Sequence, residues 1–145
     1  MHTRLIAFAS ALTLLAVTGA TAHAAATAPT VTASRSAYGV VLFGGRGKAL
    51  YAFTHDTRGR STCSGACAAA WPPYFVPGSL RAGTGTHASL LGTTTRTNGE
   101  RQVTYAGRPL YYYVGDRRPG QILCQNVSEY GGLWLVVRPS GRLVR

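Results

Sequence analysis

Two cysteines and a histidine are the residues of this chain best suited to bind a metal. Cys63 and Cys67 are separated by three residues, and His55 precedes them. Outside the cytoplasm such a pair most simply forms a disulfide, which closes so short a loop that it stabilises the fold by only about 2 kcal/mol. The alternative is a copper site, because thiolates are soft ligands and His55 would complete a Cys2His set. Either interpretation leaves Cys124 as a buried small side chain or as a partner in disulfide exchange or an intermolecular bond.

A ten-residue segment rich in aromatic residues occurs twice in the chain. Residues 47–56 match residues 107–116 with a constant offset of 60. The shared pattern is Tyr-x-(Phe/Tyr)-x-x-Asp, carried by Tyr51, Phe53 and Asp56 and by Tyr111, Tyr113 and Asp116. Residues two apart in a strand share one face, so each copy presents an aromatic pair on one side of a strand.

The aspartate of each copy has two interpretations. Asp56 and Asp116 are each followed by turn residues, where a carboxylate accepts hydrogen bonds from backbone amides. Alternatively, the two copies converge into an aromatic cleft with two carboxylates, which would suit a cation, a metal, a sugar ring or a flat apolar ligand. We favour the structural interpretation, and the sequence does not decide whether the copies converge.

The elements around these copies are expected to be short strands. Glycine contributes 18 residues and proline 7, which favours frequent turns. β-Branched or aromatic runs at 40–43 and 103–105 precede the two copies, and residues 134–144 have the pattern of a final hairpin. We therefore predict an all-β fold of two related, hairpin-rich halves that share one core, as a sandwich or small barrel. Residues 65–70 alone could be helical, and the Gly/Thr-rich residues 78–98 are expected to be a long connection.

The N-terminus has the pattern of a secretory signal peptide. Arg4 is followed by an apolar stretch at 5–17 and by small residues up to Ala24. We predict a signal peptide at 1–24, a flexible leader at 25–36, and a single domain at 37–145 with repeats at about 38–77 and 99–141. The apolar stretch falls short of the ~20 residues that span a bilayer, so the cleaved protein is expected outside the cytoplasm and free of the membrane.

Charge points to an anionic partner. The chain has 15 Lys and Arg residues against 4 Asp and Glu, a formal charge of +11 that falls to +10 when Arg4 is removed. This excess would hold the protein to an anionic polymer of the cell envelope in a salt-sensitive way, unless it is only a solvated surface. The basic residues form short clusters rather than a stripe with interleaved aromatics, which argues against nucleic acid.

Catalytic residues are scarce in this sequence. The four carboxylates and few histidines form no nucleophile elbow, zinc-protease motif or phosphate-binding loop. A hydrolase that uses Asp56 and Asp116 as a carboxylate pair is the remaining enzymatic alternative. We expect no catalysis.

The two motif copies resemble the bacterial secreted-repeat family of predicted lipoproteins that is defined by a Yx(FWY)xxD motif. The Cys-Trp-Pro-Pro segment at 61–73 and the Gly-Gly-x-Trp strand at 131–137 resemble the same family, so the likeness covers roughly residues 38–141. It implies an exported β-rich repeat module without an established activity. This chain has no cysteine just after its apolar stretch to carry a lipid. Trp71 and Trp134 are expected to be buried partners in one core.

The function that the sequence favours is a secreted, non-catalytic binding or structural module of the cell envelope, with an anionic polymer or a small ligand as partner. The alternative is an extracytoplasmic copper-binding or redox protein that uses Cys63 and Cys67.

Overall fold

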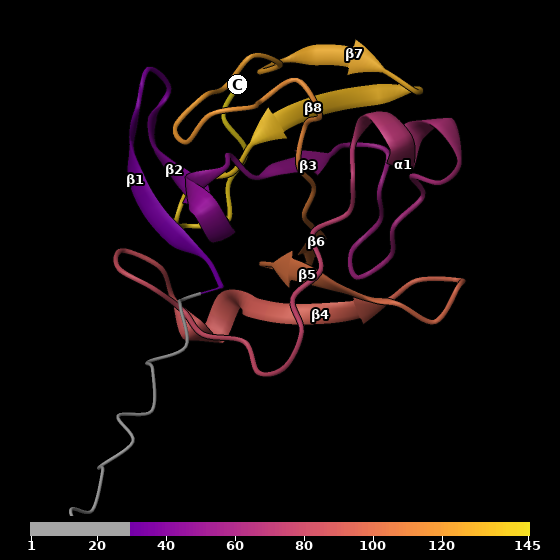
Figure 1. Cartoon of the computed structure of the whole chain (residues 1–145), viewed down its shortest axis with the longest axis horizontal. Coiled ribbons are helices and arrows are strands. Elements are labelled where there is room, and N and C mark those ends of the chain that lie inside the picture. Colours follow the sequence, from indigo (N-terminus) through magenta and orange to yellow (C-terminus); the bar gives the residue numbers. More distant parts are fainter. Residues whose placement is uncertain (1–29) are drawn as a thin grey trace, which may run out of the picture.

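Short strands make up nearly all the regular structure of the computed structural model, which describes residues 30–145 (Figure 1). The helical elements are α1 (Ala66–Ala70) and two 3-10 turns, η1 (Gly45–Gly47) and η2 (Ala88–Leu90). The strands of this part of the chain are β1 (Thr32–Ser36), β2 (Gly39–Phe43), β3 (Tyr51–Phe53), β4 (Leu91–Thr95), β5 (Arg101–Tyr105), β6 (Arg108–Pro109), β7 (Val127–Glu129) and β8 (Gly132–Val136). The predicted all-β class is confirmed, and so is the short helix. The predicted signal peptide lies outside the described residues.

The strands form three small antiparallel sheets. β1 and β2 are a hairpin, β3, β8 and β7 form one three-stranded sheet, and β4, β5 and β6 form another. Figure 1 shows the hairpin standing at one side of the two three-stranded sheets, with α1 at the other. Residues 30–145 contain no closed barrel, so of the two predicted architectures the sandwich fits.

The two repeats are interlocked rather than placed side by side. β3, from the first repeat, pairs along its whole length with β8, from the second. In the second repeat, Tyr111 makes a bridge with Pro73, and the N–H of Tyr112 donates to the carbonyl of Pro72 at 2.9 Å. Each repeat therefore obtains the closing segment of its sheet from the other.

The hairpin of each repeat likewise forms a backbone hydrogen bond with a segment of the other repeat. The N–H of Leu42 in β2 donates to the carbonyl of Val137, just after β8, at 2.9 Å. The N–H of Val103 in β5 donates to the carbonyl of Tyr74, just after the Trp-Pro-Pro segment, at 2.8 Å. The equivalence of these two bonds shows that a pseudo-twofold axis relates the halves.

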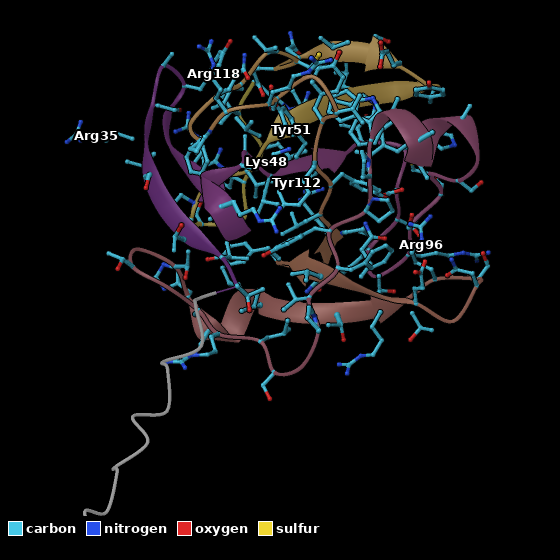
Figure 2. The ribbon with its side chains drawn as sticks, in the orientation of Figure 1. Arg35, Lys48, Tyr51, Arg96, Tyr112 and Arg118 are labelled. Carbon is cyan, nitrogen blue, oxygen red and sulfur yellow. A yellow bond between two sulfur atoms is a disulfide. The ribbon has the colours of Figure 1, made fainter. Side chains whose placement is uncertain are left out.

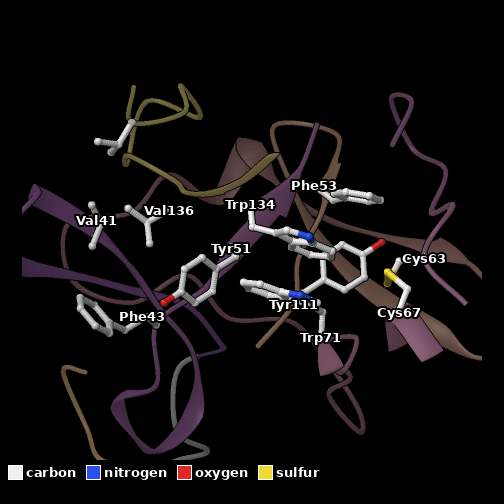
Figure 3. Close-up of a cluster of buried hydrophobic side chains, with 12 residues drawn as sticks. Val41, Phe43, Tyr51, Phe53, Cys63, Cys67, Trp71, Tyr111, Trp134 and Val136 are labelled. Atoms are coloured by element: carbon white, nitrogen blue, oxygen red, sulfur yellow. A yellow bond between two sulfur atoms is a disulfide. The ribbon is translucent and has the colours of Figure 1, made fainter. Parts of the chain in front are cut away.

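The core lies on both faces of β3, because side chains alternate along a strand. Tyr51 and Phe53 pack into a cluster with the two tryptophans and the cysteine pair, which Figure 3 shows at close range. Leu50 and Ala52, at the alternate positions, pack into a second cluster with the hairpin residues of both repeats. A strand that is buried on both faces explains why this segment is apolar at nearly every position.

Two boundaries differ from the sequence prediction. β1 lies within 25–36, where a flexible leader is predicted, so the folded domain begins earlier. Its residues have no apolar periodicity, but they gain backbone partners in β2 and in residues 81–84, through bonds such as Ala33 N–H to the Thr84 carbonyl at 2.9 Å. β4 likewise lies within the predicted connection 78–98, because pairing with β5 compensates for its weak pattern.

Candidate functional site

The two copies of the tyrosine motif meet at the centre of the molecule. Tyr51 and Tyr111 face each other across an antiparallel bridge, and the N–H of each donates to the carbonyl of the other at 2.9 Å. Both residues are fully buried. The pseudo-twofold axis therefore passes between them, which answers the question of convergence that the sequence leaves open.

Each motif tyrosine is hydrogen-bonded to the aspartate of the other repeat. The hydroxyl of Tyr51 donates to Asp116 Oδ2 at 2.6 Å, and the hydroxyl of Tyr111 donates to Asp56 Oδ2 at 2.7 Å. The sequence suggests no such exchange, because within one copy the tyrosine and the aspartate are only five residues apart. The two tyrosines and two aspartates thus form two links across the interface between the repeats rather than two separate sites.

The second oxygen of each aspartate accepts a backbone amide. Asp56 Oδ1 accepts from the N–H of Thr62 at 2.7 Å, and Asp116 Oδ1 accepts from the N–H of Leu123 at 3.0 Å. The structural interpretation expected such amide bonds, but the donors lie six and seven residues beyond the aspartates rather than in the turn directly after each. A carboxylate that holds a turn and a tyrosine of the other repeat acts as a rigid connector.

Burial alters the protonation of both kinds of residue. It raises the pKa of Asp56 and of Asp116, although the bonds from the tyrosines and amides partly offset the shift. Burial, together with the neighbouring aspartate, also raises the pKa of Tyr51 and Tyr111. Because the folded state holds these protons more tightly than the unfolded state, the two aspartates do not drive acid unfolding.

The second aromatic residue of each motif copy packs with the two tryptophans into a row of four rings. Trp71 and Trp134 lie parallel at its centre, with ring centroids 4.0 Å apart, and Phe53 stacks on the outer face of Trp134 at 4.2 Å. Tyr113 covers the other end, 4.7 Å from Trp71 (centroid to centroid). Phe53 and Tyr113 occupy equivalent positions of the two copies, as the tryptophans do of their segments, so the stack also obeys the pseudo-twofold axis.

This packing removes most of the motif from solvent. Tyr51, Phe53 and Tyr111 are buried in the core (Figure 3), and Figure 2 places Tyr51 in the interior between the sheets. A cavity of only about 100 Å³ lies beside Asp56. The rings therefore pack against one another instead of lining an open aromatic cleft.

The cysteine pair forms the predicted disulfide. Cys63 and Cys67 are bonded to each other at the start of α1, with Cα atoms 5.3 Å apart, and both side chains are buried. The ring of His55 lies 5.8 Å from that of Phe53 (centroid to centroid). Among residues 30–145, no three His, Cys, Asp or Glu side chains are grouped as a metal site. The copper interpretation requires the disulfide to be reduced first, and it stays a prediction.

Cys124 is the free cysteine in the described part of the chain. It is half-buried and packs against the tryptophan cluster. Burial raises the pKa of its thiol, the neighbouring carboxylates add to that shift, and the Tyr113 side chain beside it partly offsets it. The raised pKa favours the protonated thiol over the nucleophilic thiolate.

Arg96 is a residue that the sequence analysis missed. Its guanidinium donates to Ser61 Oγ at 2.7 Å, to Gln102 Oε1 at 2.8 Å and to the carbonyl of Cys63 at 2.6 Å. These bonds attach the disulfide loop of the first repeat to the second repeat. No local pattern identifies it, because its partners are more than 30 residues away or on the facing strand.

Substitution of the motif aspartates distinguishes connectors from ligand-binding groups. We expect Asp116→Ala to destabilise the fold by about 2 kcal/mol or more, because it leaves the buried Tyr51 hydroxyl without a partner and removes the bond from the Leu123 amide. Asp116→Asn should cost much less, since the amide oxygen accepts from Leu123 and the amide group donates to the tyrosine oxygen. Asp56→Ala and Asp56→Asn should follow the same order with smaller losses, because Asp56 is half-buried. Thermal and urea unfolding of the four variants measures this, and equal losses for Asn and Ala would contradict it.

Alkaline pH should destabilise the protein. Tyrosines of the unfolded chain ionise at about pH 10. In the folded state the pKa of Tyr51 and of Tyr111 is raised, so both hydroxyls keep their protons at this pH. Above about pH 10 the unfolded state loses protons that the folded state retains, so stability falls as the pH rises. Melting temperatures between about pH 8 and 11 test this, and the Tyr51→Phe/Tyr111→Phe double variant should lose less over that range than the wild type. Equal slopes would be inconsistent with these tyrosines as the cause.

The fold and the linked motif define an all-β module of two interlocked repeats. The model of a family described as a secreted repeat of unknown function matches the chain twice, at residues 32–74 and 92–138. These segments make up more than half of the chain and coincide with the two halves of the structure. The chain therefore belongs to this family of secreted repeats. Searches among curated proteins and among solved structures found no match.

No helix within residues 30–145 has the length and apolar character needed to cross a membrane.

Proposed function

We propose that this chain is a non-catalytic module of the cell envelope that binds anionic polymers through its arginines. The observation that carries the proposal is that the carboxylates of this protein form hydrogen bonds with neutral groups and not with its arginines or lysines. The four acidic side chains accept their hydrogen bonds from backbone amides and from tyrosine, threonine, tryptophan and asparagine side chains. None of these bonds comes from an arginine or a lysine, so the formal charge of +10 that remains without Arg4 is available to face a partner.

The state of the motif supports a role without catalysis. A pair of catalytic carboxylates needs to reach a substrate, but Asp116 is almost wholly buried and Asp56 is bonded to Tyr111 and Thr62. Both aspartates are already engaged in holding the repeats together. The motif is thus the scaffold, and the exposed arginines are the groups available for binding.

The family and the disulfide support a location outside the cytoplasm. The family is described as secreted, and a disulfide persists in an oxidising compartment. Anionic polymers of the envelope are the polyelectrolytes that an exported basic protein meets at high local concentration. Electrostatic attraction to them is long-ranged and is weakened by salt.

Binding to simple polymers tests the proposal. We expect the protein without residues 1–24 to bind polyphosphate and poly-glutamate at about 50 mM salt and not to bind neutral dextran of matched length. Affinity should fall at least about tenfold at 300 mM salt, because counterion release then favours binding less. The polymers should keep their length, as gel electrophoresis would show. Equal binding to dextran, or no binding at low salt, would overturn the proposal.

A further inference from the structure

A basic groove lies between β6 and the hairpin that ends the chain. It has a volume of about 600 Å³. The residues that line it are Arg108, Arg138, Ser140, Arg142, Leu143 and Arg145. Four arginines therefore line one space, and no Asp or Glu residue is among the lining residues.

The walls of this groove are held rigidly. The hydroxyl of Tyr105, at the end of β5, donates to the carbonyl of Pro139 at 2.8 Å. Gly141 packs so closely on the methyl group of Ala106 that a side chain at this position would collide with it. The β5–β6 turn of the second repeat and the final hairpin are thus fixed to each other, so the arginines are presented by a preformed surface.

Like charges are placed side by side within the hairpin. The N–H of Arg138 donates to the carbonyl of Arg142 at 2.8 Å, which makes these two arginines neighbours across the turn. Both side chains are exposed. Like charges at neighbouring positions destabilise a hairpin unless an anion lies between them. Their arrangement therefore favours a bound anion.

The type of cation indicates the type of anion. All four positive groups of the groove are guanidinium groups. Guanidinium forks donate two parallel hydrogen bonds to a phosphate or carboxylate, whereas an ammonium acts as a point charge. A water molecule occupies roughly 30 Å³ in the liquid, so the groove has room for more than one phosphate group and the links between them.

We propose that this groove binds successive phosphate groups of a linear polymer, with the arginines on the phosphates, the Ser140 hydroxyl as a further donor and Leu143 against the link between phosphates. This inference rests on the proposed function and adds to it a site and a ligand chemistry. It also predicts selectivity: a phosphate chain should bind more tightly than a carboxylate chain of equal length and charge.

Two double variants of equal charge test the site. Arg138→Ser/Arg142→Ser removes two guanidinium groups from the groove. Arg117→Ser/Arg118→Ser removes two that are exposed outside it, in the segment where Figure 2 labels Arg118. With polyphosphate at about 100 mM salt, we expect the groove variant to bind at least tenfold more weakly than the wild type. The control should change by less than about threefold. Circular dichroism and melting temperature confirm that each variant is folded.

A third variant keeps the test valid if loss of charge disturbs the hairpin. Arg138→Lys/Arg142→Lys retains the charge but removes the forks, and should weaken polyphosphate binding several-fold. Inorganic phosphate should compete only at much higher concentration than polyphosphate. Competition at equal phosphate concentration would mean a site for free phosphate and would overturn the polymer assignment.

The outcomes separate this inference from the proposed function. Equal weakening in the groove variant and the control would overturn the groove and leave a diffuse polyanion-binding surface. Equal affinity of the wild type for polyphosphate and poly-glutamate would overturn the phosphate assignment. Failure of the wild type to bind any polyanion would overturn the proposed function and this inference together.

Discussion

Replacing either Trp71 or Trp134 by alanine is expected to destabilise the protein by about 3–5 kcal/mol, which approaches the whole stability of a small domain. Both indoles are fully buried and stack on each other at the axis that relates the repeats. Each substitution therefore opens a cavity and also removes the stacking partner of the other ring. Urea unfolding followed by far-ultraviolet circular dichroism measures the loss, and a change under about 1 kcal/mol for both would contradict the packing.

Phenylalanine variants provide a matched comparison between the two tryptophans. The indole N–H of Trp71 donates to Glu129 Oε2 at 2.9 Å, whereas the indole N–H of Trp134 is buried without a partner. Trp71→Phe loses a hydrogen bond, while Trp134→Phe removes a donor whose burial is costly. We expect Trp71→Phe to be the more destabilising of the two. The reverse order would contradict the assigned partners.

When the chain is cut between the repeats, we expect each isolated fragment to be unfolded and the two fragments to fold together when they are mixed. A break between Gly78 and Ser79, in an exposed segment, separates β3 from β8 and both hairpins from their partners. Neither fragment retains both tryptophans of the stack or all strands of the β3–β8–β7 sheet. Each alone should therefore show no cooperative melting, because it exposes apolar surface and unpaired strand edges.

Mixing the two fragments should restore the fold as a one-to-one complex. Stacked indoles give an exciton couplet in the far-ultraviolet circular dichroism spectrum, so this signal should appear only after mixing, because each fragment carries one tryptophan. Sedimentation measures the stoichiometry, and the uncut protein is the reference for the signal. A single fragment that melts cooperatively as a monomer would show that the repeats are independent.

Much of the architecture was predictable because it depends on local patterns. The repeat with its constant offset, the β-branched runs of β2 and β5, and the glycine-rich turns are all visible within a few residues. The disulfide between Cys63 and Cys67 was predictable for the same reason, since only three residues separate them. Burial of both tryptophans followed from their size and from their positions beside fixed bends.

The weakly patterned elements were not predictable. β1 and β4 consist largely of small and polar residues, and they are strands because β2, β5 and residues 81–84 supply backbone partners. Arg96 gave no signal either, because the groups that it binds come together only in the fold. In each case a distant segment provides the stabilising contact.

The sequence by itself determined that the chain has two related β-rich halves, that aromatic and aspartate positions recur in both, and that its surface is strongly basic. Only the tertiary structure decided that each motif tyrosine is bonded to the other repeat's aspartate, and that four of the arginines line one groove. Periodicity and composition act over neighbouring residues, whereas Tyr51 and Asp116 are 65 residues apart along the chain. Which of two equivalent partners a buried hydroxyl finds depends on how the repeats interlock, and interlocking is set by packing across the pseudo-twofold axis.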